Sequence, residues 1–142
     1  MTKLIIQICC FNEAKTLPAT LCDLPRTLNG VDLVEVQVVD DGSNDDTIEV
    51  ARELGVARII PLKSHQGLAG AFKVGVESAI ENGADILVNV DGDNQYRAAD
   101  MQKLIEPILS QKADLVVGCR PIWDHPEFSF INSSTIKTVS NC

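Results

Sequence analysis

Residues 88–95 read VNVDGDNQ, and this stretch ends an apolar run with a dense group of polar side chains. Asp91 and Asp93 stand one residue apart, and the amide of Gln95 follows. Two like charges at this spacing repel each other, so a compensating positive charge is expected nearby. Mg²⁺ and Mn²⁺ prefer carboxylate and amide oxygens, often with phosphate oxygens completing the coordination shell. The stretch therefore predicts a strand that ends at a divalent-cation site shared with a diphosphate.

Other apolar runs of strand length lie on both sides of this stretch and alternate with helix-like segments. Strands are predicted over residues 4–10, 34–39, 57–62, 85–90 and 115–118. Between them we expect a helix over 13–28 capped by Asn12, one from Ser43 or Asn44 to Gly55, one from the SHQGLAG turn to Asn82-Gly83, and one over 99–111 that Pro107 kinks or interrupts.

This alternation predicts an α/β fold with a mostly parallel, Rossmann-like sheet and helices on both faces. Strands covered on both faces should be almost continuously apolar, and VQVV, ILVNV and LVVG fit that expectation. The composition changes after Pro121, where the chain has no clear period and many Ser, Thr and Asn residues. We therefore expect a domain over residues 1–121 and an atypical tail over residues 122–142.

Composition and charge narrow the class of protein. The 142 residues are 45% hydrophobic, which is enough for a core, and carry a net charge of −8, which argues against nonspecific binding of nucleic acid. The 5 cysteines are odd in number and include no C-x-x-C pair, which favours reduced thiols. No stretch approaches the ~18 apolar residues of a membrane helix, so we expect a soluble, cytoplasmic chain.

Acidic or amide side chains follow three of the predicted strands. Ligands of open α/β sheets bind outside the carboxyl ends of the strands, so these clusters should meet at one edge. The first two can accept hydrogen bonds from a base or ribose, the third can hold the cation, and Gly92 allows close approach of backbone and ligand. The three clusters are Phe11-Asn12-Glu13, Asp40-Asp41-Gly42-Ser43 and Asp91-Gly92-Asp93-Asn94-Gln95.

Each cluster alone also has a purely structural interpretation. Asp-Gly pairs are common in turns, and Asp45 and Asp46 could simply complement the positive end of a helix. Asn12-Glu13 could be only a helix cap. The Gly67–Gly75 stretch matches neither G-x-G-x-x-G nor the P-loop pattern, so it could be a helix start packed on the sheet. The combination of clusters is more informative than any one of them.

Over residues 3–121 the chain resembles glycosyltransferase family 2, and most closely its branch akin to dolichyl-phosphate mannosyltransferase. Five segments carry the resemblance, in the family's order and at similar intervals: ICCFNEAKTLPATL, VVDDGSNDDTIEVA, HQGLAGAFKVGVESA, VNVDGDNQYRAADMQKLIEPI and DLVVGCRP. The resemblance implies a GT-A-type nucleotide-diphospho-sugar transferase fold, and a nucleotide-sugar-binding role for residues 1–121.

The resemblance also implies roles for individual residues. Phe11, Asn12 and Glu13 match the aromatic-Asn-Glu that lines the nucleotide pocket, and Asp40 with Asp41 matches the pair that recognises base and ribose. Cys9, just before them, is expected to bind the nucleotide as well. Asp91, Gly92 and Asp93 match the D-x-D motif for metal and sugar nucleotide. Gln95 matches a further metal ligand, and Arg120 matches a basic residue placed for phosphate.

The chain departs from the family pattern at several positions. Family members usually have Pro where Cys9 stands and Asn where His65 stands. His65 and His125, the 2 histidines of the chain, have no partner at ligand spacing and are interpreted as ordinary loop residues. The acceptor half of the family, which supplies the general base, should begin near Phe128. The catalytic base is therefore unknown, and we expect a truncated acceptor side.

These observations together predict the sugar-nucleotide-binding part of an inverting, metal-dependent glycosyltransferase. The expected donor is GDP-mannose or UDP-glucose, the cofactor Mg²⁺ or Mn²⁺, and the acceptor a polyprenyl or other lipid phosphate at the cytoplasmic face of a membrane. A homodimer that covers an exposed sheet edge is a further expectation. Two alternatives stay open: a nucleotide-binding module without catalytic activity, and a nucleotidyltransferase, although FNEAKT replaces the Gly-rich basic loop that the latter requires.

Overall fold

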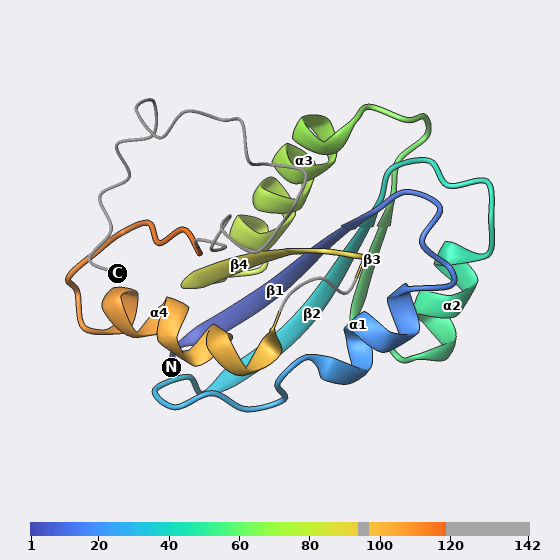
Figure 1. The fold of residues 1–142 in the computed structure, drawn as a ribbon. Helices are drawn as coiled ribbons and strands as arrows, with labels where there is room; N and C mark the ends of the chain where they lie inside the picture. Colours follow the sequence, from blue (N-terminus) through green and yellow to red (C-terminus); the bar gives the residue numbers. More distant parts are fainter. Residues whose placement is uncertain (94–96, 119–142) are drawn as a thin grey trace, which may run out of the picture.

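A computed structural model describes residues 1–93 and 97–118 of the chain (Figure 1). Its centre is a 4-stranded sheet in the order β3-β2-β1-β4, and every neighbouring pair of strands is parallel. The predicted α/β architecture with a parallel sheet is confirmed. The strands are β1 (Lys3–Cys10), β2 (Leu33–Asp40), β3 (Arg58–Pro61) and β4 (Ile86–Asp91).

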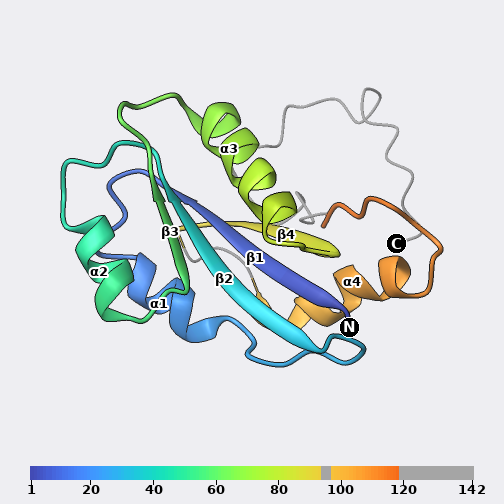
Figure 2. The ribbon, with the colours of Figure 1, turned by 180° about the vertical axis from the view of Figure 1, so that it is seen from behind.

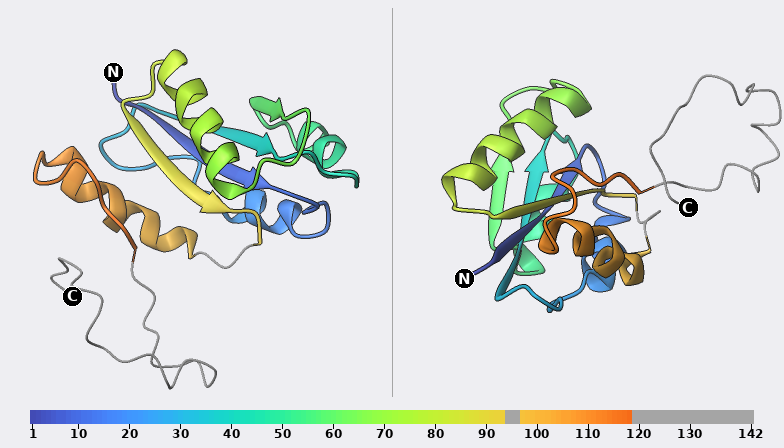
Figure 3. Two further views of the ribbon diagram at one scale, coloured as in Figure 1. Left: turned by 90° about the horizontal axis from the view of Figure 1, so that it is seen from above. Right: turned by 90° about the vertical axis from the view of Figure 1, so that its left-hand side faces the viewer.

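Helices cover both faces of the sheet, as Figures 2 and 3 show. α3 lies alone on one face, where it contacts β1 and β2. The opposite face packs against the other helices through a core of buried aliphatic side chains. The helices are α1 (Leu17–Asp23), α2 (Thr47–Glu53), α3 (Leu68–Glu81), the 3₁₀ turn η1 (Ala98–Asp100) and α4 (Met101–Leu109).

β1 is the central strand, and it is buried on both faces. Leu4, Ile6 and Ile8 belong to the aliphatic cluster on the α1, α2 and α4 side. The opposite face holds Gln7, whose amide lies in register with Gln37 on β2 and Asn89 on β4. Burying an amide is costly unless it is hydrogen-bonded, so this face needs a specific network under α3.

That network is a row of amides across three strands. Gln37 donates to Gln7 Oε1 at 2.9 Å and to the Gly75 carbonyl at 2.7 Å. Gln7 donates to Asn89 Oδ1 at 3.0 Å. A Cβ at position 75 would lie 2.2 Å from Gln7 Oε1, so only glycine lets α3 sit this close. The row therefore fixes the depth at which α3 packs on the sheet.

Two helices begin later than the sequence predicts. Asn12 does not cap α1, because its φ of 56° places it in the left-handed region and Thr16 is the N-cap instead. α2 begins at Thr47 after Asp46, so neither Ser43 nor Asn44 caps it. The residues between each strand and its helix form loops, and these loops supply contacts that matter for the candidate site.

The predicted helix ends were partly wrong. α1 stops at Asp23 rather than near Leu28, because Leu24 precedes Pro25 and adopts an extended ψ of 136°. Leu24 and Leu28 still point into the core. α3 ends at Glu81, immediately before the predicted stop at Asn82-Gly83, and Gly55 follows the end of α2 with a φ of 70°. Pro107 lies inside α4 and does not end it.

The fifth strand predicted over residues 115–118 is wrong. These residues have no strand assignment, and Leu115 and Val117 are 80% and 70% exposed. Their apolar composition is typical of a strand, yet a strand also needs a hydrogen-bonding neighbour. Within the part of the chain that the structure describes, β4 pairs with β1 and no strand lies beside residues 115–118.

Candidate functional site

A cavity of about 380 Å³ opens at the carboxyl ends of β1, β2 and β4. This is the edge at which parallel α/β sheets bind ligands. The lining combines carboxylates with aromatic and aliphatic side chains and with two cysteines. The lining residues are Cys9, Cys10, Phe11, Glu13, Asp41, His65, Leu68, Ala71, Asp91, Gly92 and Asp93.

Four of these residues are acidic, and they come from the ends of three different strands. Glu13 follows β1, Asp41 follows β2, and Asp91 and Asp93 stand at the end of β4. Parallel pairing produces this convergence, because Cys9 lies opposite Asp91 and Cys10 opposite Asp40 in the two registers. The structure therefore brings together the acidic residues that the sequence placed at one edge.

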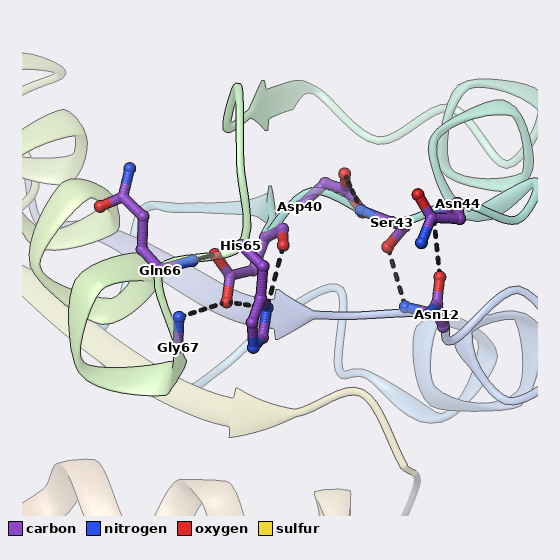
Figure 4. Close-up of polar contacts among 8 residues, drawn as sticks. Asn12, Asp40, Ser43, Asn44, His65, Gln66 and Gly67 are labelled. Carbon is purple, nitrogen blue, oxygen red and sulfur yellow. Dashed lines mark hydrogen bonds and ion pairs between the residues drawn. The ribbon is translucent and has the colours of Figure 1, made fainter.

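Asp41 is nearly buried, with its side chain 5% exposed. Its carboxylate accepts hydrogen bonds from the backbone N–H groups of Gln66 at 2.7 Å and Gly67 at 2.8 Å. His65 Nδ1 lies 2.9 Å from Asp41 Oδ2. Figure 4 shows His65, Gln66 and Gly67 gathered around this carboxylate. Asp41 thus holds the loop that leads into α3 as well as facing the cavity.

Asp40 behaves differently from its neighbour, because alternate residues of a strand point to opposite faces. It is 1% exposed and does not line the cavity. Its Oδ2 accepts a hydrogen bond from the Ser43 N–H at 3.1 Å, whereas its Oδ1 is buried without a hydrogen-bond partner among the described residues. The structure thus separates Asp40 from Asp41, which the sequence had treated as one pair.

Asn12 also lies outside the cavity lining and instead joins two loops. The Asn12 N–H donates to Ser43 Oγ at 2.8 Å, and Asn12 Oδ1 accepts from the Asn44 N–H at 2.8 Å, as Figure 4 shows. The next residue continues the pattern, because the Glu13 N–H donates to Thr47 Oγ1 at 3.0 Å. These bonds fix the loops after β1 and β2 to each other and so orient Glu13 toward the cavity.

The sequence analysis missed four residues of the cavity lining, which are Cys10, His65, Leu68 and Ala71. His65 is the one with a polar ring. It lies against Phe11, with ring centroids 4.1 Å apart and a tilt of 34° between the planes. The two rings form one wall of the cavity beside Asp41. The spacing of His65 along the chain gave no sign of this, because its partners come from other strand ends.

The glycine and cysteines at the floor of the cavity pack tightly. A Cβ at Gly92 would lie 3.1 Å from Cys10 Sγ and 3.3 Å from Glu13 Cγ, so a larger residue there would crowd both side chains.

Burial raises the pKa of the Cys9 thiol. A hydrogen bond from Gln7 opposes this rise, and the charges of Asp91 and Asp41 add to it. Burial and then the charge of Glu13 raise the pKa of Cys10. Both thiols are therefore protonated at neutral pH and are poor metal ligands.

The oxygen donors suit a hard cation better than the sulfurs do. Asp91 and Asp93 both line the cavity and offer carboxylate oxygens, which Mg²⁺ and Mn²⁺ prefer. Within residues 1–93 and 97–118, no group of 3 or more His, Cys, Asp or Glu is arranged to hold a metal by itself. The donor set fits a cation that takes its remaining ligands from a bound phosphate. Gln95 and Arg120, the other predicted ligand and phosphate contact, lie outside the described residues.

Residues 5–140 match the family model described as glycosyl transferase family 2. The chain belongs to glycosyl transferase family 2. A family 2 relative, the UDP-N-acetylglucosamine–dolichyl-phosphate N-acetylglucosaminyltransferase of Methanococcus voltae, is 32% identical over 92% of this chain and 56% of its own length. The undecaprenyl-phosphate mannosyltransferase of Micrococcus luteus is 33% identical over 79% of this chain and 46% of its own length.

Solved structures agree with the fold. The mannosyltransferase PcManGT from Pyrobaculum calidifontis, solved with GDP-Man and Mn²⁺, has a TM-score of 0.57 at 25% identity, over 68% of this chain and 29% of that one. The glucosyl-3-phosphoglycerate synthase of Mycobacterium tuberculosis, solved with Mn²⁺ and UDP, has a TM-score of 0.61 at 23% identity, over 77% and 40%. The fold is of the GT-A type expected for family 2.

The chain spans about half the length of the curated family 2 relatives described above. Among residues 1–93 and 97–118, no helix combines the length and the apolar character that crossing a membrane requires.

Proposed function

We propose that this chain is the sugar-nucleotide-binding part of an inverting, metal-dependent glycosyltransferase that delivers a hexose to a polyprenyl phosphate. The observation that carries the proposal is the convergence of Glu13, Asp41, Asp91 and Asp93 on one cavity at the carboxyl edge of the sheet. Membership of family 2 supports the reaction class. The polyprenyl-phosphate and dolichyl-phosphate acceptors in the names of two relatives support the acceptor class.

The cavity has two chemically different ends in this proposal. Phe11 and Asp41 stand at the nucleoside end, where an aromatic face and a buried carboxylate suit a base and its N–H donors. Asp91 and Asp93 stand at the diphosphate end. Mg²⁺ or Mn²⁺ bound there would act as a Lewis acid for the charge that grows on the departing diphosphate. Glu13 lies between the two ends and is oriented by the Asn12 loop.

The protein's own contribution is to hold the donor so that its C1 faces the acceptor. An acceptor phosphate oxygen forms a bond to C1 as the bond from C1 to the diphosphate oxygen breaks, which inverts the configuration. In this proposal the nearly buried Asp41 carboxylate and the Phe11 ring orient the donor. Such positioning lowers the barrier, because the entropy cost of aligning the reactants is met when the donor binds. Arg120 is expected to contact a phosphate after the donor binds.

The proposed donor is GDP-mannose or UDP-glucose. One neighbour in fold was solved with GDP-Man and another with UDP, and both contain Mn²⁺. The proposed place of action is the cytoplasmic face of a membrane, where a lipid-phosphate acceptor would present its headgroup. A nucleotide-binding module without transfer activity is the second candidate, because the chain spans only about half of its curated relatives.

Binding measurements test the proposal directly. Calorimetric titration of the wild-type chain with GDP and with UDP should show binding of at least one that requires Mn²⁺. The double substitution Asp91→Asn and Asp93→Asn should abolish the Mn²⁺-dependent part, because it removes the charges that hold the cation. Glu53→Gln with Glu81→Gln, which removes the same charge at exposed positions outside the cavity, should leave binding unchanged. Equal affinity of the Asp91/Asp93 variant and the wild type would refute the metal site.

A further inference from the structure

The backbone around His65 is held in place by contacts on three sides. The Leu62 N–H donates to the Asp40 carbonyl at 2.8 Å, just before His65. The N–H groups of Gln66 and Gly67 donate to the Asp41 carboxylate just after it. Gly42 lies so close to this loop that a Cβ at position 42 would be 2.8 Å from the backbone nitrogen of His65. The direction of the imidazole is therefore determined by the fold.

The imidazole has one partner on each of two sides. Its Nδ1 lies within hydrogen-bond distance of the Asp41 backbone carbonyl oxygen, at 3.3 Å, and 2.9 Å from Asp41 Oδ2. Because a carbonyl and a carboxylate only accept, Nδ1 must carry the proton and donate. Its ring lies 4.1 Å from the Phe11 ring, centroid to centroid. The side chain is nevertheless 54% exposed and lines the cavity, so a large part of its surface can contact a ligand.

Asp41 alone can recognise little of a base. A carboxylate has about four lone-pair sites, and Asp41 uses two of them to accept from the N–H groups of Gln66 and Gly67. Its Oδ2 also lies 2.9 Å from His65 Nδ1, so little of the carboxylate is left for donors on a ligand. Most of the affinity for a flat heterocycle must then come from ring surfaces, and every base has a face that can stack on an aromatic side chain.

We propose that His65 is a nucleobase-binding residue: its ring forms with Phe11 an aromatic surface against which the base of a nucleoside diphosphate lies, while its Nδ1–H keeps Asp41 in place. This inference rests on the proposed function. The ring contact separates ligands that carry a base from those that carry only phosphates.

Three substitutions divide the roles of the side chain. His65→Ala removes ring and donor, His65→Asn keeps a donor and removes the ring, and His65→Phe keeps a ring and removes the donor. Calorimetry with Mn²⁺ uses the nucleoside diphosphate that binds the wild type. The affinity for this ligand should fall about tenfold in His65→Ala and at least about fivefold in His65→Asn. His65→Phe should stay within about threefold of the wild type. Inorganic pyrophosphate with Mn²⁺, which has no base, should bind all four proteins alike.

The outcomes separate the possible explanations. An unchanged nucleotide affinity in His65→Ala would overturn the inference. A wild-type affinity in His65→Asn together with a weakened one in His65→Phe would overturn it too, because His65 would then act only through Asp41. Equal weakening of pyrophosphate would reveal general damage to the site and would also overturn it. Ser64→Ala, at the exposed neighbouring position, is the matched control and should change nothing. Failure of the proposed function itself would be visible in the wild type, which would then bind neither GDP nor UDP.

A spectroscopic measurement gives an independent readout. The chain has 2 histidines, so the His65 ring signals are identified by their loss in the His65→Ala spectrum. Stacking of a base on the imidazole should shift these signals when the nucleoside diphosphate is added, and pyrophosphate should leave them in place. Ring signals that stay unmoved at saturating nucleotide would overturn the inference.

Discussion

Gly42 is the residue on which the loop around the candidate site depends most directly. Its φ is +77°, and a Cβ there would lie 2.8 Å from the His65 nitrogen and 3.0 Å from the Ser64 carbonyl carbon. Both are backbone atoms, and the hydrogen bonds of the following Gln66 and Gly67 N–H groups to Asp41 restrict how far this loop can move aside. Gly42→Ala should lower the free energy of unfolding for two reasons. Placing alanine in the left-handed region costs ~1–2 kcal/mol, and the clash of its Cβ with the loop adds a similar amount. Urea denaturation measures the change.

Gly83→Ala is the matched control for this prediction. Gly83 has a φ of +68° but no atom within 4 Å of its hypothetical Cβ, so alanine there carries the backbone cost without the clash. The difference between the two variants isolates the contact with the His65 loop. Equal losses of stability in both would contradict the contact.

Asp41 should matter for stability as well as for binding. Asp41→Ala leaves the N–H groups of Gln66 and Gly67 without their acceptor, which should cost roughly 1–3 kcal/mol of unfolding free energy. Nucleoside diphosphate binding should weaken by a similar amount, while the affinity for Mn²⁺ alone should barely change. Denaturation and calorimetry on the same variant measure both effects. Asp23→Ala, at an exposed position, serves as control, and a metal-binding defect without a nucleotide defect would reverse the assignment.

At the level of residues, the sequence predicts strand-end positions better than side-chain contacts. Glu13, Asp41, Asp91 and Asp93 meet at one cavity because parallel strands end at a common edge, which the apolar runs alone indicate. The opposite directions of Asp40 and Asp41 also follow from strand alternation, although the motif invited treating them together. The position of His65 could not be predicted, since Phe11 and Asp41 reach it from distant parts of the chain.

At the level of elements, α2 depends on the exposed carboxylate of Asp45. Burial is the largest single influence on the pKa of Asp45 and raises it, but the hydrogen bonds from the Thr47 side chain and from the Ala14 and Thr47 N–H groups together outweigh burial and lower this pKa below its usual 3.8. A lowered pKa in the folded state means that the carboxylate stabilises the fold above the unfolded pKa. That stabilisation is lost as the pH falls through the folded pKa.

Asp45→Asn should therefore destabilise the protein at pH 7 by ~0.5–1 kcal/mol, because it weakens the start of α2 and its link to the Ala14 loop. The difference from the wild type should shrink once the pH falls below about 4, since the wild-type carboxyl is then protonated as well. Denaturation series at several pH values measure this. Asp46→Asn is the control, because the Asp46 side chain makes no capping hydrogen bond. A pH-independent difference would argue against the carboxylate's role.

The order of the elements from β1 to α4 was predictable, and their ends were predictable only in part. Apolar periodicity marks where strands and helices occur, whereas ends depend on local competition. Pro25 ends α1 through its effect on Leu24, a signal that was available in the sequence but was outweighed by the leucine spacing. The first turns of α1 and α2 were misplaced because Asn12, Ser43 and Asn44 use their polar groups between loops rather than on a helix.

At the level of the whole molecule, we expect the 142-residue chain alone to transfer no sugar at a useful rate. Among the described residues, the carboxylates that line the cavity are the four assigned to nucleotide and metal, which leaves the general base unassigned. The lack of a base typically costs 10²–10⁴-fold in rate, and poor positioning of the acceptor adds to the loss. The assay combines GDP-mannose or UDP-glucose, Mn²⁺ and polyprenyl phosphate, with labelled sugar counted in the lipid fraction.

Light scattering on the same sample checks the association state, since a homodimer that covers the sheet edge remains a prediction. A nucleotide-binding module would bind GDP or UDP and transfer nothing in any mixture. Robust turnover by a monomer would contradict the expectation and would show that the described cavity is sufficient for catalysis.

The fold class and the family could both be predicted from the sequence, because they depend on the alternation of elements and on motifs of five segments. The extent of the sheet could not. Residues 115–118 have the composition of a strand, but composition does not reveal whether a partner strand is beside them. Strand pairing needs two segments. Only the three-dimensional structure shows that, in the described part of the chain, residues 115–118 have no neighbouring strand to pair with.

β4 occupies the edge of the described sheet, and hydrogen bonds join it to β1 on one side only. Edge elements with a single neighbour open locally at a lower free energy than central ones, and such openings form separate cooperative units. The cavity thus joins parts of the sheet with unequal local stability. Glu13 and Asp41 follow the central strands β1 and β2, whereas Asp91 ends the edge strand β4. A local opening of β4 would move Asp91 away from the cavity while the nucleoside end stays assembled. The contacts to the phosphates of a bound nucleoside diphosphate would then break before the contacts to its base.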